Sequence, residues 1–223
     1  MSRSTAMIEA AVDKAIAIPA SRITERVARM RRDRPGADTA ELVMLAADRF
    51  RNEAGLSSGA VGASAALPSI GTASAAALTV GQTAVFIGSA VTYVLTVAEL
   101  QGLRVVEPEK RRALVLSALL GREGSEAVQG QLGLASLFWA AQALAQMPIP
   151  TAKSINAQLA KRLAKRAAAK GGAIALGRLL PLGIGAAIGY SGGRALANQV
   201  IEGAQAALGP ASPFAPAMEV IEA

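Results

Sequence analysis

The 223-residue sequence contains no cysteine and no histidine. Without cysteine it has neither a disulfide framework nor a thiol nucleophile. Without histidine it lacks the most frequent general base at neutral pH and the most frequent metal ligand in proteins. It also has no Walker loop and no G-x-G-x-x-G motif that opens a helix after a strand. Because the usual parts of an active site are missing, we expect no enzymatic activity and no cofactor.

Aromatic and charged residues are scarce as well. Aromatic residues make up only 3% of the chain. Charged residues make up 17%, whereas soluble domains contain roughly 25% charged residues. Small side chains, which let helices approach closely, supply much of the 52% hydrophobic content. The composition therefore favours extensive burial, either in protein or in lipid.

Charge is missing altogether between Ala54 and Ala98. Pro68 disfavours helix at the preceding residue and lacks an amide donor, so we predict a turn over LPSIGT between helical arms at 55–67 and 72–101. The first arm would be about 20 Å long, shorter than the roughly 30 Å hydrocarbon core of a bilayer. Basic residues flank both ends, which favours a hairpin that enters and leaves on the same face over a single span. An ordinary buried helix pair is the alternative.

Amphipathic helices are predicted before this hairpin. Asp38 and Glu41 have the spacing of a capping box, which starts a helix expected to end near Gly55. Glu9 and Asp13 interrupt the apolar stretches of the first 20 residues, a pattern that a secretory signal does not tolerate. We therefore expect a cytoplasmic location.

Two further helices are predicted after the hairpin. Pro108 suits the first turn of a helix that ends at Gly121. The uncharged stretch 127–152 has room for one helix of roughly 18 residues, stopped by Pro148 and Pro150.

The stretch KSINAQLAKRLAKRAAAKGG predicts a helix with a cationic face opposite Leu159 and Leu163. Such a face is typical of a helix on an anionic leaflet, although a merely solvated face is the commoner explanation for a single helix. Nucleic acid is disfavoured because the chain lacks stacking aromatic residues and known motifs. The candidate headgroup-binding residues are Lys161, Arg162, Lys165, Arg166 and Lys170.

A stripe of small residues marks the predicted helix at 182–202. Gly185, Gly189 and Gly193 recur at every fourth position, and Ala197 continues the series. On a helix this spacing forms a face along which a second helix can pack at short distance, in lipid or in water.

Glu99 ends the long uncharged run, within reach of Arg111 or Arg112. A structural ion pair or an interfacial position is favoured over a proton-handling role. An enzyme would need this acid and one of these arginines in a water-accessible pocket.

Four motifs, in order, carry a resemblance to a known family. They are GAVGASAALPSIGTASA (59–75), TYVLTVAELQGLRV (92–105), EKRRALVLSALLG (109–121) and GRLLPLGIGAAIGYSGGRAL (177–196). This set resembles the EcsC protein family in its actinobacterial form over residues 20–209. It departs from the family pattern at Gly193, where asparagine is common.

The resemblance implies little about chemistry. No catalytic residues are established for EcsC-like proteins, and the founding member is named for its place beside an ABC transporter involved in secretion. The matching positions serve only as family-marking residues: Pro68, Gly71, Glu99, Gly102, Arg111, Arg112, Gly121, Pro181 and Gly185.

Together these features predict a single all-α domain over 1–209, with a central Ala/Gly-rich hairpin and a glycine-striped C-terminal helix, followed by a Pro-rich, loosely ordered tail at 210–223. The expected function is that of a non-enzymatic protein on the cytoplasmic side of the membrane, peripheral or hairpin-inserted. Its expected partner is the membrane surface or anionic lipid, with a membrane protein as a second class of partner. The alternative is a soluble helical bundle that acts as an interaction module.

Overall fold

Nine helices and two short strands form the described part of the chain. The computed structural model describes residues 3–64, 72–134, 138–177, 184–211 and 219–221, with side chains described within 9–60, 81–134, 138–166 and 189–211. The helices are α1 (Arg3–Ile16), α2 (Ala20–Asp33), α3 (Thr39–Ser64), α4 (Thr72–Leu100), α5 (Pro108–Leu119), α6 (Arg122–Leu132), α7 (Trp139–Ala143), α8 (Ile149–Gly177) and α9 (Ile184–Leu208). The prediction of a single all-α domain is confirmed.

Several predicted helix ends are found in the structure. The amide of Asp38 donates to Glu41 Oε2 over 3.1 Å, and the amide of Glu41 donates to Asp38 Oδ1 over 2.8 Å, which completes the capping box before α3. Pro108 occupies the first turn of α5. Gly121 lies just after that helix with a φ of +74°. Residues other than glycine rarely adopt this backbone conformation.

Two predicted boundaries are wrong. Helix α3 does not end near Gly55 but continues to Ser64, because this glycine serves close packing against Tyr190 of α9. The stretch 127–152 is not one helix: α6 ends at Leu132, and Gly133, with a left-handed φ of +66°, caps it. Pro150 lies in the first turn of α8, where its missing amide costs no hydrogen bond.

The strands β1 (Leu103–Val105) and β2 (Glu219–Ile221) pair in parallel, with Arg104 opposite Val220. Strand β2 comes from the segment predicted as a loosely ordered tail. The sequence held no signal for this pairing, because the two partners are three residues each and far apart along the chain.

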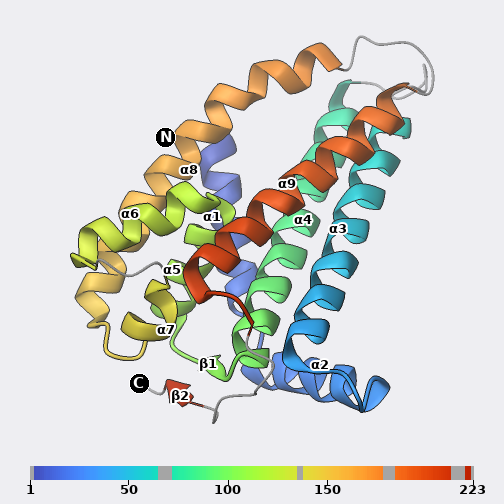
Figure 1. Cartoon of the computed structure of the whole chain (residues 1–223). Helices are drawn as coiled ribbons and strands as arrows, with labels where there is room; N and C mark the ends of the chain where they lie inside the picture. The colour runs from blue at the N-terminus through green and yellow to red at the C-terminus, as the bar shows by residue number, and fades with distance from the viewer. Residues whose placement is uncertain (1–2, 65–71, 135–137, 178–183, 212–218, 222–223) are drawn as a thin grey trace.

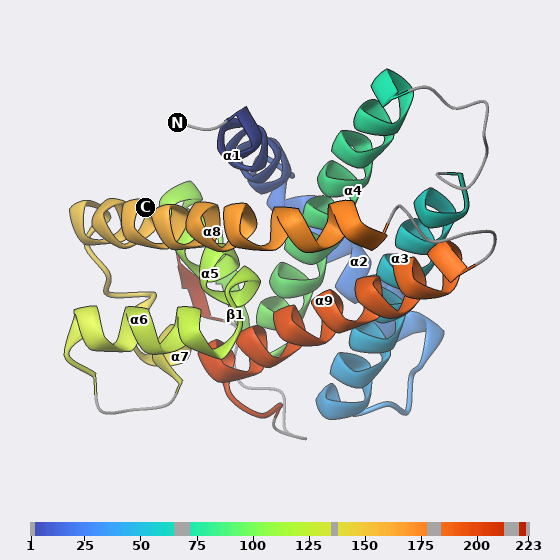
Figure 2. The ribbon, with the colours of Figure 1, turned by 90° about the horizontal axis from the view of Figure 1, so that it is seen from above.

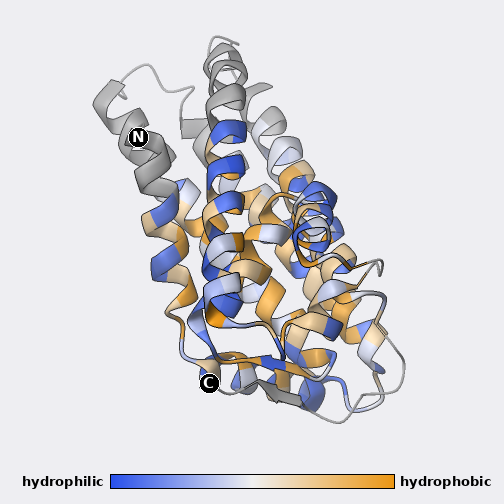
Figure 3. Ribbon diagram, turned by 90° about the vertical axis from the view of Figure 1, so that its left-hand side faces the viewer, coloured by the Kyte–Doolittle hydropathy of each residue, from blue (hydrophilic) through white to orange (hydrophobic). Residues whose placement is uncertain are grey.

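The elements wrap around α5, which is buried along most of its length (Figure 1). Helices α3, α4 and α9 form one side of the molecule, α6 and α8 lie on the other side of α5, and α1 packs against α4 and α8 (Figures 1 and 2). Hydrophobic residues gather toward the centre of the described body (Figure 3). Trp139 is completely buried there and donates its indole N–H to Ser125 Oγ over 2.9 Å.

Candidate membrane-facing surface

Four helices present uncharged ends at the same end of the molecule (Figures 1 and 2). These segments are 54–64 of α3, 72–86 of α4, 171–177 of α8 and 184–193 of α9, and none of them contains Asp, Glu, Lys or Arg. We call this set the apolar end. The rest of the molecule, which carries the described ion pairs, is the body.

Two large apolar side chains of the apolar end face outward. Leu56 is 66% exposed and Val85 is 56% exposed. A Cβ added at Gly81 or Gly88 of α4 would meet no atom within 4 Å, so this face of the helix is open. Exposed large apolar residues that gather on one surface are typical of interaction sites.

The second half of α4 has different surroundings. Its side chains from Tyr93 to Leu100 are all buried, as are those of Ile87, Ala90 and Val91. Gly81–Leu100 is the only stretch within the described residues that is long and apolar enough to cross a membrane, and 61% of it is buried inside the protein. The second half of α4 is therefore a core helix.

The glycine stripe lies against α3. A Cβ on Gly189 would come within 2.5 Å of the carbonyl oxygen of Ser58, and one on Gly193 would overlap the carbonyl oxygen of Ala54. Ala197, the next in the series, is completely buried. Gly185 belongs to α9, but its side-chain surroundings lie outside the described residues. Small residues at these positions let α3 and α9 touch backbone to backbone.

Polar contacts begin where the uncharged parts of α3 and α9 end. Arg194 donates to Asn52 Oδ1 over 2.8 Å and to the hydroxyl of Tyr190 over 3.1 Å, and its guanidinium lies 5.7 Å from the centre of the Tyr190 ring. Arg51 donates to Asn198 Oδ1 over 2.7 Å. These five residues, which we call the boundary residues, link the two helices over about 12 Å of α9, from Tyr190 to Asn198.

The predicted cationic face of α8 divides in two. Lys161, Arg162 and Lys165 are exposed, as a headgroup-binding role requires. Arg166 instead turns toward the body, where it donates to the carbonyl of Leu120 over 2.9 Å and to Gln199 Oε1 over 3.0 Å. We therefore correct its predicted role: this arginine ties α8 to the end of α5 and to α9. Lys170 belongs to α8, with its side chain outside the described residues.

A second basic surface, on α2, was missed by the sequence analysis. Helix α2 lies at the opposite end of the molecule from the apolar end (Figure 1). Its apolar side packs into the core through Ile23, Val27 and Met30. The available signal was the arginine-rich face opposite these residues. Its exposed members include Arg22, Arg29, Arg31 and Arg32.

Glu99 and Arg111 lie close enough for their charges to interact within the body. Both side chains are buried. Burial lowers the pKa of Arg111, while the charge of Glu99 acts in the opposite direction and that of Arg104 adds to the lowering. Arginine still stays protonated at neutral pH. Arg112 does not join them but pairs with Asp13 of α1.

Three backbone carbonyls hold the guanidinium of Arg111. Its Nε donates to Val105 over 2.5 Å, and its Nη1 donates to Ile16 over 3.2 Å and to Ile18 over 2.7 Å. These acceptors belong to β1, to the last residue of α1 and to the link between α1 and α2. Arg111 therefore fastens three parts of the chain together, which is a structural role.

Two family-marking glycines are found at positive φ, Gly102 at +86° and Gly121 at +74°. Each of the two lies just after the end of a helix, where a positive φ favours glycine. Pro68, Gly71 and Pro181 lie outside the described residues.

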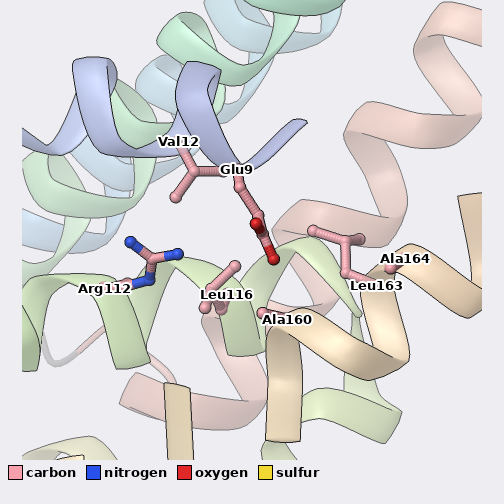
Figure 4. A pocket seen from close by; sticks show the side chains of 7 residues that line it. All are labelled: Glu9, Val12, Arg112, Leu116, Ala160, Leu163 and Ala164. Atoms are coloured by element: carbon pink, nitrogen blue, oxygen red, sulfur yellow. The ribbon is translucent and has the colours of Figure 1, made fainter. Parts of the chain in front are cut away.

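A groove of about 620 Å³ runs between α1, α5 and α8. Its lining includes Lys153 and Lys161 of α8, Glu9 of α1 and Glu109 of α5. Figure 4 shows the small apolar hollow next to it, lined by Leu116, Ala160 and Leu163 among others. Because charges of both signs line the groove, it favours neither an anionic nor a cationic ligand. Within the described residues, no group of three or more acidic side chains could hold a metal ion.

No family model matches this chain, and no curated protein or solved structure shows a significant match to it. The resemblance to the EcsC family therefore rests on the four motifs quoted above.

Proposed function

We propose that this protein is a non-enzymatic, membrane-associated protein whose apolar end contacts lipid on the cytoplasmic side. The observation that carries the proposal is the convergence of four uncharged helix segments at one end of the molecule. A helical bundle surrounded by water ordinarily carries charged residues on its outward faces. Here Leu56 and Val85 occupy such outward positions.

The cations of α8 support the same proposal. Lys161, Arg162 and Lys165 are exposed, and no ion pair among the described residues includes them. Each lysine or arginine near an anionic surface contributes about 1 kcal/mol of attraction. Three such residues on one side of α8 would favour anionic over neutral lipid.

Membership in the EcsC family is part of this proposal. The four motifs support it, and the position of the founding member beside a transporter suggests an accessory role to a transporter or to another envelope process. The structural roles of Arg111 and Arg112, which bind backbone carbonyls and Asp13, support a protein without an active site.

A soluble interaction module is the second candidate. It is favoured by the burial of the second half of α4 in the protein core. In this case the apolar end would bind a protein partner, such as a membrane complex, with no lipid contact.

Flotation with lipid vesicles tests the proposal. The intact chain is mixed with vesicles of phosphatidylcholine alone or with added phosphatidylglycerol, and the floating fraction is measured. We expect flotation with the anionic vesicles. A chain that stays at the bottom of the gradient with both compositions would refute membrane association and leave the soluble module.

Two triple variants locate the basic contact. One carries Lys161→Gln, Arg162→Gln and Lys165→Gln, and omits Arg166 because that residue holds the body together. The matched control, Arg29→Gln, Arg31→Gln and Arg32→Gln, removes three exposed charges from α2 at the opposite end. We expect the α8 variant to lose anionic-lipid flotation and the α2 variant to keep it. The reverse result would move the contact to α2.

A further inference from the structure

The uncharged parts of α3 and α9 have nearly the same length. At 1.5 Å per residue, α3 continues for about 16 Å beyond Glu53, and α9 runs for about 15 Å before Arg194. On α8, Lys165 lies about 18 Å from the helix end. Lys170 is about 10 Å from that end. The uncharged stretch of α8 is shorter, since Arg178 directly follows Gly177 in the sequence, so the matching lengths are those of α3 and α9.

This common length matches one leaflet. The hydrocarbon core of a bilayer is about 30 Å thick, so each leaflet contributes about 15 Å. A spanning domain would need twice the observed length on each of its helices. Only α4 stays uncharged for longer, and from Tyr93 onward all its side chains are packed inside the body.

The boundary residues have the chemistry of a membrane–water interface. Tyrosine is enriched at that level because its ring is apolar and its hydroxyl is polar. Tyr190 is partly exposed, and its hydroxyl accepts a hydrogen bond from Arg194. The contact between Arg51 and Asn198 adds a second arginine, one residue before the Asn52 to which Arg194 donates.

From these observations we infer that the apolar end enters a single leaflet and stops at the boundary residues, so that the protein is monotopic. The exposed cations of α8 lie near the level of the anionic headgroups, and the body stays in water. This inference rests on the proposed membrane association, and it adds the depth and the sidedness of the contact.

The absence of cysteine from the chain allows a depth measurement along one helix. Exposed positions of α3 are replaced one at a time, as Ala60→Cys, Leu56→Cys and Met44→Cys. The first lies about 6 Å from the end of α3, the second about 12 Å and the third about 30 Å. Because all three side chains are exposed, none of these changes removes core packing.

Each variant is labelled with an environment-sensitive fluorophore and bound to vesicles of phosphatidylcholine and phosphatidylglycerol. Spin-labelled lipids that quench at the headgroup or within the acyl chain are then added. We expect strong acyl-chain quenching at position 60 and quenching shifted toward the headgroup at position 56. We expect no more quenching at position 44 than without vesicles.

Three outcomes would overturn the inference. Bound protein without acyl-chain quenching at position 60 would indicate adsorption to the surface, which leaves membrane association intact. Acyl-chain quenching at position 44 would mean that the body also enters lipid. Reaction of unlabelled Ala60→Cys with an impermeant thiol reagent sealed inside the vesicles would indicate spanning. Failure of all variants and of the unaltered chain to float refutes the proposed function itself, and the inference with it.

Discussion

The body of this protein buries charged side chains, whereas its apolar end exposes uncharged ones. In the body, Lys110 is buried and donates to the carbonyl of Ala145 over 3.0 Å, and Arg111 binds three carbonyls. At the apolar end, Leu56 and Val85 are more than half exposed. Burial is thus decided by what the neighbouring elements offer to each side chain. The two halves of α4, both uncharged up to Ala98, illustrate this most directly.

The largest effect is expected from the buried charge of the body. Arg111→Gln removes the partner of three carbonyls and leaves Glu99 without its nearby buried cation. Breaking a buried charge contact of this kind costs about 3–5 kcal/mol of unfolding free energy. Denaturant unfolding measures it. In the control Arg112→Gln, which breaks a partly exposed pair with Asp13, the loss should be no more than about 1 kcal/mol. Equal losses of unfolding free energy in the two variants would show that the buried contacts of Arg111 contribute no more than the exposed pair of Arg112.

The contrast between the halves of α4 predicts the next effect. Leu100→Ala empties a fully buried site and should lower the unfolding free energy by about 2–5 kcal/mol. Val85→Ala, at an exposed position of the same helix, should change it by no more than about 0.5 kcal/mol. Both values come from denaturant unfolding in the absence of lipid. A large loss from the Val85 change would mean that this face is covered in solution.

A smaller effect is expected where the two regions meet. Gly193→Ala places a Cβ against the carbonyl of Ala54 and within 2.6 Å of Ser58 Oγ, so α3 and α9 must separate. Overpacking of this kind costs about 1–3 kcal/mol. Gly192→Ala is the matched control, because its Cβ meets nothing within 4 Å and alanine favours helix by about 0.5–1 kcal/mol. In thermal unfolding, Gly193→Ala should lower the melting temperature and Gly192→Ala should raise it.

The smallest effect concerns pH. Burial raises the pKa of the Tyr93 hydroxyl, and the charge of Arg51 offsets part of the shift. In the unfolded chain tyrosine loses its proton near pH 10, whereas the folded protein retains it. Since the folded state then binds more protons, this residue's contribution to stability is complete below about pH 10 and falls as the pH rises above it.

Tyr93→Phe should abolish that decline. It should change stability little at neutral pH, because the hydroxyl has no hydrogen-bond partner within the described residues. Unfolding free energies at neutral and alkaline pH measure the difference, with Tyr190→Phe as the control on the partly exposed tyrosine. An unchanged alkaline decline in the Tyr93 variant would show that Tyr93 does not cause it.

Local chemistry could be predicted from the sequence where it depends on neighbouring residues. The capping box of Asp38 and Glu41 and the first-turn position of Pro108 follow from short spacings, and both are found. The prediction failed at Gly55, where the residue type suits either a helix end or a close contact. In the structure Tyr190 of α9 packs against Gly55, and this contact between distant residues could not be predicted from the local sequence.

The candidate site shows the same division. The cationic spacing on α8 predicted one continuous face, but the distant Gln199 and the carbonyl of Leu120 draw Arg166 out of it. Periodicity reports which residues share a face of a helix and not what packs against that face. The basic face of α2 and the pairing of β1 with β2 depend equally on elements far apart along the chain.

By itself, the sequence determined that this protein is helical, has no thiol or imidazole chemistry and contains a long stretch without charge. These properties depend on composition and on short-range spacing. The tertiary structure decided which half of α4 is core, that the glycines of α9 meet α3, and that four uncharged helix segments gather at one end. Contacts between distant segments set these features, because the same apolar helix can be covered by protein at one end and open at the other.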